Sequence, residues 1–332
     1  MEVTSRNHTV DIFRLLASFF IVFLHVGFKN MDENIIAVIR ISGRWGVPFF
    51  FLLSGYYFQK SLTKSPSKAL WKNCSRIFYI LIVADIIYII ALYAFDGHFN
   101  WKHILLGAYF HLWFLPSLIM GTVTCFLINK FQIKFYLSLA LSLLIIFLVL
   151  LTDSYSSILQ LKTERFIGYV IPLLSIPYMI IGSFFSNRNW FKNLIQPKVG
   201  FLMLFLGFFL QIIEVKLINI YTTRSMVEHQ YLIGTLFLSI GIFILAFSLK
   251  FKNERLGKWG KELSLFIYLY HPFVILLLYH TNHELIFKGN TVILFPIFVF
   301  SITLLVSILI YKYLNRLFLI LTGSLKEVFN AK

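Results

Sequence analysis

Long apolar runs recur along the whole chain and are separated only by short polar connections. Windows of about 20 residues, the length that spans the apolar part of a bilayer as a helix, identify about ten such runs. Their approximate bounds are 9–28, 44–61, 76–95, 111–128, 135–152, 166–186, 198–215, 231–249, 263–281 and 292–320. Hydrophobic residues make up 59% of the sequence and charged residues only 13%, a balance unlike that of soluble domains. We therefore predict an all-α integral membrane protein with about ten transmembrane helices.

The connections between these runs are too short to form a separate soluble domain. The whole chain, 1–332, is predicted as one polytopic membrane domain whose first helix spans 9–28 and whose last spans 292–320. The first run contains Asp11 and Arg14 and is followed by no small-residue cleavage site. We therefore expect it to stay in place rather than be removed as a signal peptide.

Basic residues are divided unevenly between the two predicted sides of the membrane. If the N-terminus lies in the cytoplasm and loops alternate, most of the 30 lysines and arginines fall inside. The positive-inside rule then favours both termini in the cytoplasm, and we expect the protein in the cell membrane. This topology accounts for the net charge of +16 without a nucleic-acid partner. The two cysteines, Cys74 and Cys125, have no metal-ligand spacing, so we expect no metal site.

Most of the histidines fall on the opposite, outer side. Those in or beside predicted outer loops are His98, His103, His111, His229, His280 and His283. Polar loops often contain histidine, so this distribution has an ordinary explanation. An outer cleft that binds a polar acceptor explains it equally well.

The first apolar run, "DIFRLLASFFIVFLH" from Asp11 to His25, carries polar residues on one helical face. Arg14 and His25 are eleven positions apart, which is about three turns and about 16 Å along the axis. Asp11 and Ser18 extend the same stripe. An arginine at the centre of a membrane helix costs about 2.5–3.5 kcal/mol on insertion scales, so its placement requires an explanation.

Two explanations of this stripe are open. Arg14 can reach the inner interface, paired with Asp11, while His25 caps the outer end of the helix. Alternatively, the stripe faces a protein interior, where Arg14 meets an anionic group from the cytoplasm and His25 handles protons.

Four further segments complete a recognisable pattern with the Arg14-x10-His25 spacing. They are "RWGVPFFFLLSGYYF" (44–58), "KNCSRI" (72–77), "HLWFLPSL" (111–118) and "GKELSLFIYLYHPF" (260–273). Together they resemble the membrane-bound acyltransferase-3 family, which acylates cell-surface glycans. The resemblance extends over most of the chain, and the family's ten-helix pattern matches the apolar runs.

The resemblance implies acyl transfer, commonly of acetyl, from cytoplasmic acyl-CoA to a hydroxyl of an extracytoplasmic polysaccharide or its lipid-linked precursor. Acetyl-CoA or another acyl-CoA is then a donor substrate, and no permanently bound cofactor is implied. The family's arginine and histidine carry over to Arg14 and His25, and its basic cluster to Lys72 and Arg76. Lys72 and Asn73 depart from the usual arginines, and a lysine cannot form the bidentate contact of a guanidinium with phosphate.

The chemistry of acyl transfer gives these residues distinct tasks. Arg14, Lys72 and Arg76, with Lys68 as a further candidate, can hold the anionic donor through charge-assisted hydrogen bonds. His25 can act as general base on the acceptor hydroxyl. It can also accept the acyl group itself, and the sequence leaves both roles open.

Several other residues are candidate acceptor or cavity contacts. They are Ser54, His111, Trp113, Tyr268 and His271. Ser54, Trp113 and His271 have structural alternatives. Ser54 with Gly55 can permit close helix packing, and Trp113 can anchor the membrane interface. Pro272, which directly follows His271, interrupts the helix and frees backbone carbonyls, so a satisfied structural histidine is equally consistent.

A transporter or flippase of a small metabolite or lipid-linked sugar is the alternative function. Arg14, His25, Asp85 and Glu214 would then form a proton or substrate pathway, although pairing within the bundle is the default role for both acidic residues. Paired broken helices in two corresponding halves, the usual mark of such a site, are not evident in the sequence. A transporter moves its solute without an acyl donor, whereas an acyltransferase consumes acyl-CoA and releases free thiol.

Overall fold

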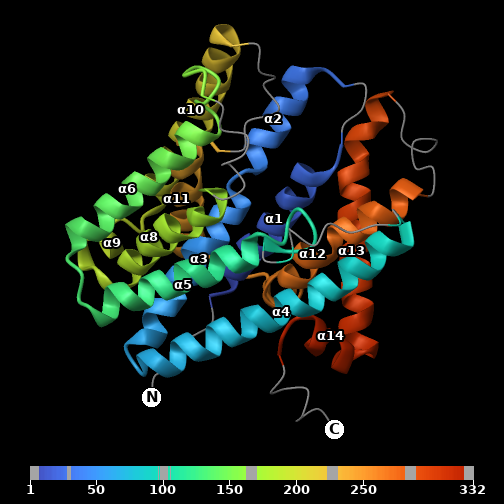
Figure 1. Cartoon of the computed structure of the whole chain (residues 1–332), viewed down its shortest axis with the longest axis horizontal. Helices are drawn as coiled ribbons and strands as arrows, with labels where there is room; N and C mark the ends of the chain where they lie inside the picture. The colour runs from blue at the N-terminus through green and yellow to red at the C-terminus, as the bar shows by residue number, and fades with distance from the viewer. Residues whose placement is uncertain are drawn as a thin grey trace.

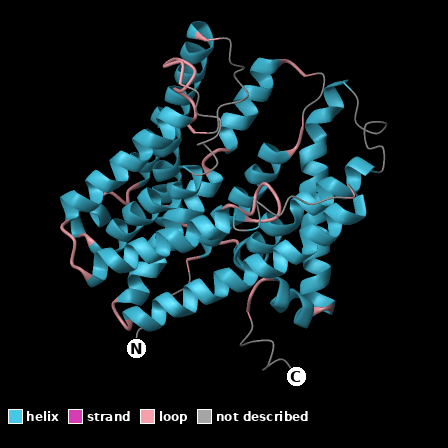
Figure 2. Ribbon diagram, viewed as in Figure 1, coloured by secondary structure: helices cyan, strands magenta, loops and turns pink. Residues whose placement is uncertain are grey.

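The computed structural model describes residues 7–27, 31–95, 97, 104, 106–161, 170–222, 231–280 and 289–324. Within these ranges the chain contains helices and loops and no strand (Figure 2). The predicted all-α class is therefore confirmed for this part of the chain.

Figure 1 shows how the helices are arranged. In chain order they are α1 (His8–His25), α2 (Glu33–Gly43), α3 (Gly46–Leu62), α4 (Pro66–Phe95), α5 (Phe114–Lys130), α6 (Phe135–Thr152), the 3₁₀ turn η2 (Ile171–Leu174), α8 (Ser175–Asn187), α9 (Asn189–Asn193), α10 (Pro197–Tyr221), α11 (Ile233–Ser248), α12 (Glu254–His280), the 3₁₀ turn η4 (Gly289–Leu294), α13 (Phe295–Tyr313) and α14 (Asn315–Leu321).

Each predicted apolar run overlaps an apolar helix, although residues 28, 166–169 and 281 of the runs lie outside the described residues. Among the described residues, seven helical segments are long and apolar enough to cross a membrane. Shorter apolar helices cover Phe114–Lys130, Ile171–Asn187 and Ile233–Ser248. The chain is therefore a multi-pass helical protein, while the total of about ten spans and the cytoplasmic location of both termini stay predictions.

One helix, α2, has no counterpart among the predicted runs, and two runs have different bounds in the structure, each for a local reason. Glu33–Gly43 is helical rather than part of a connection, because the Asp32 carboxylate accepts hydrogen bonds from two amides of its first turn. Helix α4 begins ten residues before the predicted 76, at Pro66, a residue suited to the first turn of a helix. The last run is divided at Leu314, whose ψ of 48° is not helical and separates α13 from α14.

Glycines allow the central helices to approach closely. A β-carbon on Gly260 would overlap the backbone carbonyl of Asp11, so α12 can cross α1 at this point only with glycine. A β-carbon on Gly55 would similarly overlap the carbonyl of Met179 where α3 crosses α8. These crossings bring α1, α3, α8 and α12 together around one core.

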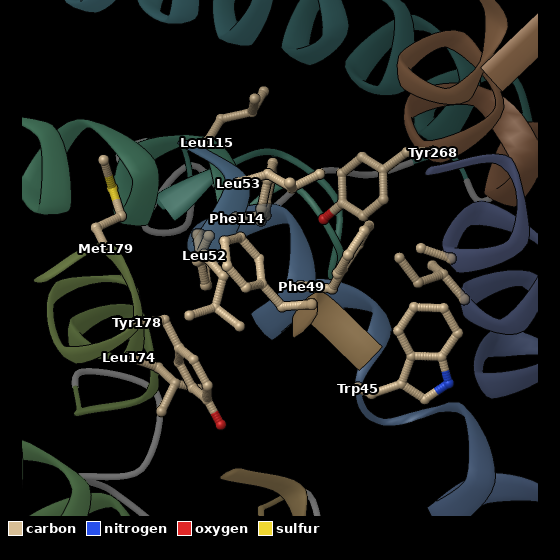
Figure 3. Close-up of a cluster of buried hydrophobic side chains, with 14 of the residues drawn as sticks. Trp45, Phe49, Leu52, Leu53, Phe114, Leu115, Leu174, Tyr178, Met179 and Tyr268 are labelled. Carbon is tan, nitrogen blue, oxygen red and sulfur yellow. The ribbon is translucent and has the colours of Figure 1, made fainter. Parts of the chain in front are cut away.

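Aromatic and aliphatic side chains fill the space between these helices. Figure 3 shows part of the cluster, which includes Trp45, Phe49, Leu52, Leu53, Phe114, Leu115, Leu174, Tyr178, Met179 and Tyr268. The α3 residues Phe49 and Leu52 are fully buried, so α3 is the central helix of the core. The outward faces of α4 and α10 instead expose apolar side chains such as Ile86 and Phe205, as expected where lipid replaces water.

Candidate active site

A cavity of about 1040 Å³ opens among helices α1, α3, α4, α5, α12 and α14. The cationic residues that line it are Arg14 from α1, Lys72 and Arg76 from α4, and Lys261 from α12. The predicted donor-binding residues are thus brought together from two separate helices. Lys68 is exposed and is not among the lining residues. Lys261 was not predicted from the sequence, because only the α1–α12 crossing brings it beside Arg14.

Arg14 is paired with Asp11, as the first explanation of the polar stripe predicts, and lines a protein cavity, as the second predicts. Its Nη1 donates a hydrogen bond to Asp11 Oδ1 at 3.1 Å, and its guanidinium carbon lies 5.6 Å from the centroid of the Tyr57 ring. Its side chain remains 27% exposed and lines the cavity. The Asp11 carboxylate therefore orients Arg14 without removing it from the cavity.

Arg76 and Lys261 also have polar partners. Arg76 Nη2 donates to the Thr322 carbonyl at 3.2 Å, which ties α4 to the end of α14 and places Thr322 in the cavity wall. Lys261 Nζ lies 2.8 Å from Glu262 Oε1, yet half of its side chain is exposed. Cations from several elements can therefore meet one anionic ligand.

Aromatic rings close the inner part of the cavity. Tyr268 lies seven residues beyond Lys261 on α12, which corresponds to about 10 Å along the helix. Its ring centroid is 4.9 Å from that of Phe114 and 6.5 Å from that of Phe50, and all three side chains line the cavity. Ser54 also lines this part, with its hydroxyl bonded to the Phe50 carbonyl at 2.8 Å.

Three histidines lie directly behind Tyr268. His25 ends α1, His271 lies within α12 and His111 lies in the loop before α5. Their ring centroids are 5.1 Å apart for His25 and His271, 5.9 Å for His111 and His271, and 6.4 Å for His25 and His111. The Tyr268 hydroxyl donates to the His111 carbonyl at 2.7 Å. Tyr268 therefore separates the cavity from the histidine cluster and contacts both.

Each histidine of the cluster is hydrogen-bonded. Nδ1 of His25 lies 2.8 Å from Nε2 of His271. His271 Nδ1 lies 2.9 Å from the Ile267 carbonyl and 3.0 Å from the Tyr268 carbonyl. His111 Nε2 lies 3.0 Å from the Leu269 carbonyl. His111 and His271 are buried, whereas His25 is only partly so.

The loop that carries His111 is anchored by Asp85. Asp85 Oδ1 accepts a hydrogen bond from the Ala108 amide at 2.6 Å. The preceding Gly107 has a φ of +103°, a conformation that favours glycine. Asp85 is therefore a structural anchor of this loop rather than a cavity residue.

The other sequence candidates have different surroundings. Glu214 accepts hydrogen bonds from the Tyr155 hydroxyl and from the first amides of α11, so it fixes α11 on α10. Trp113 is partly buried, packs 6.3 Å from the Phe51 ring and is not among the cavity residues. His280 stacks on Phe95.

The remaining outer histidines, His98, His103, His229 and His283, lie outside the described residues. The described part of the chain has no group of three His, Cys, Asp or Glu residues suited to a metal ion.

Comparisons with known proteins identify the family of this chain and several relatives of low sequence identity. A family profile described as an acyltransferase domain, of the acyltransferase-3 type, matches residues 7–312. The chain is 25% identical to an amino-acid racemase of Enterococcus faecalis over 337 residues, covering 92% of this chain and 46% of that protein. It is 26% identical to a serine/alanine racemase of Enterococcus gallinarum over 302 residues, covering 81% and 41%. The chain thus spans less than half the length of these relatives. No solved structure matches it.

Proposed function

Because the chain belongs to the acyltransferase-3 family, we propose that it transfers an acyl group, acetyl in the first instance, from cytoplasmic acyl-CoA to a hydroxyl of a cell-surface glycan. The acceptor is an extracytoplasmic polysaccharide or its lipid-linked precursor. The protein would act in the cell membrane, with its termini and the cationic mouth of the cavity on the cytoplasmic side.

One observation carries this proposal: the cation-lined cavity ends at Tyr268, and the three histidines lie directly behind that ring. The nucleotide of coenzyme A carries several phosphates, which suit Arg14, Lys72, Arg76 and Lys261. The thioester arm is long and narrow and would extend along the apolar part of the cavity toward Tyr268. Displacement of the aromatic rings there would admit the acyl group to the histidines.

At the histidine cluster, His25 would act as the general base. It takes the proton from the acceptor hydroxyl as that oxygen attacks the carbonyl carbon of the thioester. The carbon–sulfur bond then breaks, and the leaving thiolate takes up the proton held by His25. The products are an ester on the glycan and free coenzyme A.

The proposal is tested by measuring base-labile ester on the surface glycan of the host by mass spectrometry. We expect ester in the wild type, none in a deletion strain, and none when the deletion is complemented with His25→Ala at equal membrane abundance. His280→Ala is the matched control, because this histidine is exposed and lies outside the cluster; it should restore the ester. Equal ester levels in all strains would exclude glycan O-acylation.

Transport of a small metabolite or flipping of a lipid-linked sugar is the second candidate. The relatives are named as racemases of amino acids, which favours a small amino acid as the solute. More than half of each relative has no counterpart in this chain, so the named activity need not belong to the shared part. Uptake of labelled serine or alanine into vesicles without acyl-CoA, together with no thiol release, would favour transport over acyl transfer.

A further inference from the structure

The hydrogen bonds of His271 determine which nitrogen of His25 carries a proton. His271 Nδ1 contacts only the carbonyl oxygens of Ile267 and Tyr268, at 2.9 and 3.0 Å. A carbonyl oxygen can only accept, so Nδ1 of His271 must be the protonated donor. In a neutral imidazole the other nitrogen, Nε2, is then an acceptor.

His25 must donate to this acceptor. Its Nδ1 lies 2.8 Å from His271 Nε2, so the proton of a neutral His25 is on Nδ1. Nε2 of His25 then keeps its lone pair, and no described residue forms a hydrogen bond with it. This lone pair is the one that a general base requires.

Pro272 leaves the backbone carbonyl of Tyr268 without its usual helical donor. In a regular helix the carbonyl of residue 268 would accept from the amide of residue 272, but proline has no N–H. The Tyr268 carbonyl is therefore available to His271 Nδ1. Helix α12 continues through this position, so the proline redirects one carbonyl without ending the helix.

The neighbouring carbonyl orients the rest of the cluster. Leu269 O accepts from the Tyr88 hydroxyl at 2.8 Å and from His111 Nε2 at 3.0 Å. His111 is consequently protonated on Nε2, and its buried Nδ1 has no hydrogen-bond partner among the described residues. Within the described residues, no carboxylate contacts His271 to stabilise its charged form.

We propose that His271 is a positioning residue that holds His25 in the tautomer with an unprotonated Nε2, and that the Tyr268 carbonyl released by Pro272 fixes this arrangement. The inference rests on the proposed function, because it assigns His25 the base role. His271 itself accepts no substrate proton, since its bonds end on backbone carbonyls. His271 thus fixes the tautomer of His25 as a carboxylate fixes that of the catalytic histidine in a Ser-His-Asp triad, but without the negative charge of a carboxylate.

The test compares His271→Leu with His271→Gln in the full-length protein. Leucine removes the nitrogen that accepts from His25 Nδ1–H. The side-chain amide oxygen of glutamine can accept this hydrogen bond in place of His271 Nε2. ¹⁵N NMR of histidine-labelled protein in lipid reports the tautomer, and the His25 signals are those missing from His25→Ala. Thiol release from acetyl-CoA in host membranes containing the glycan reports turnover, and membrane abundance reports folding.

We expect wild type and His271→Gln to show His25 with a protonated Nδ1, and His271→Leu to show mixed tautomers. The kcat of His271→Leu should fall by about 10²-fold or more, with KM for acetyl-CoA changed by less than about threefold. His271→Gln should keep turnover within about tenfold of wild type, a partial rescue that a merely structural role would not give.

Two results would overturn the inference. One is an unchanged His25 tautomer in His271→Leu, and the other is equal kcat loss in both variants although glutamine keeps the tautomer. A wild type that holds the tautomer but releases no thiol would instead overturn the proposed acyl transfer and leave the tautomer assignment standing. The NMR and the turnover measurement therefore separate the two failures.

Discussion

Substitution of Lys72 by glutamine should weaken binding of the donor nucleotide without changing the rest of the protein. Lys72 lines the cavity beside Arg76, and its side chain is exposed to the cavity opening. Lys68 is one turn earlier on the same helix, is also exposed and does not line the cavity. Lys68→Gln therefore removes the same charge from the same helix and is the matched control.

The expected magnitude follows from the exposure of Lys72. An exposed ion pair contributes about 0.2–1 kcal/mol, and a hydrogen bond to a charged group about 1.5–3 kcal/mol. A bound nucleotide would cover Lys72 only in part. The contribution of Lys72 to the binding free energy should therefore lie between these two ranges, at about 1.4 kcal/mol. This free energy corresponds to about a tenfold increase in Kd.

The assay is isothermal titration of purified protein in detergent with coenzyme A, followed by titration with pantetheine, which lacks the nucleotide phosphates. Lys72→Gln should raise the Kd for coenzyme A about tenfold, and Lys68→Gln by less than about twofold. Neither variant should change the affinity for pantetheine. Because the contact is electrostatic, the difference between the two variants should also shrink as salt is added.

Two outcomes would refute this reasoning. If both lysine variants weaken coenzyme A binding equally, the effect is one of overall charge rather than of the cavity. If Lys72→Gln also weakens pantetheine binding, the side chain contacts another part of the donor or supports the cavity wall.

Three further substitutions test the architecture around the site. Tyr268→Phe removes a hydroxyl bonded to the His111 carbonyl and should lower turnover by about threefold to tenfold while donor affinity, measured by titration, stays constant. Gly55→Ala places a methyl group against the Met179 backbone and should destabilise the fold by about 1–3 kcal/mol, read as a lower melting temperature in detergent; an unchanged melting temperature would contradict the close crossing. Asp85→Asn replaces the carboxyl group on α4 that accepts from the Ala108 amide of the loop before α5 with an amide and should cost about 1 kcal/mol on the same melting assay, with activity lost only as far as the loop shifts.

Local sequence patterns were sufficient to locate the helices and the two ends of the site. Apolar runs of bilayer length predicted helices that the structure contains, because a membrane helix must satisfy its backbone internally and be apolar over most of its length. Eleven-residue spacing placed Arg14 and His25 on one face of α1, and the structure puts one in the cavity and the other in the histidine cluster.

The parts that the sequence did not predict depend on contacts between distant helices. His25 and His271 are separated by 246 positions, so neither the pair nor its tautomer is visible in a local pattern. Lys261 reaches the cavity only because Gly260 lets α12 cross α1 closely. Helix α2 is not predicted for a different reason: it has only 11 residues, about half the length of the windows that identify membrane-spanning runs.

Arg14 and His25, the polar residues at the two ends of the stripe on α1, are each stabilised by a different hydrogen-bond partner. Arg14 is bonded to Asp11 and remains open to the cavity, so it avoids most of the roughly 2.5–3.5 kcal/mol that a lipid-exposed arginine would cost. His25 is instead hydrogen-bonded to His271, and His271 in turn donates to a carbonyl that Pro272 leaves without its helical donor. None of these hydrogen bonds involves His25 Nε2. The same requirement that makes polar groups costly in a membrane interior therefore leaves the lone pair of His25 Nε2 without a hydrogen bond from any described residue, behind the Tyr268 ring where the cavity ends.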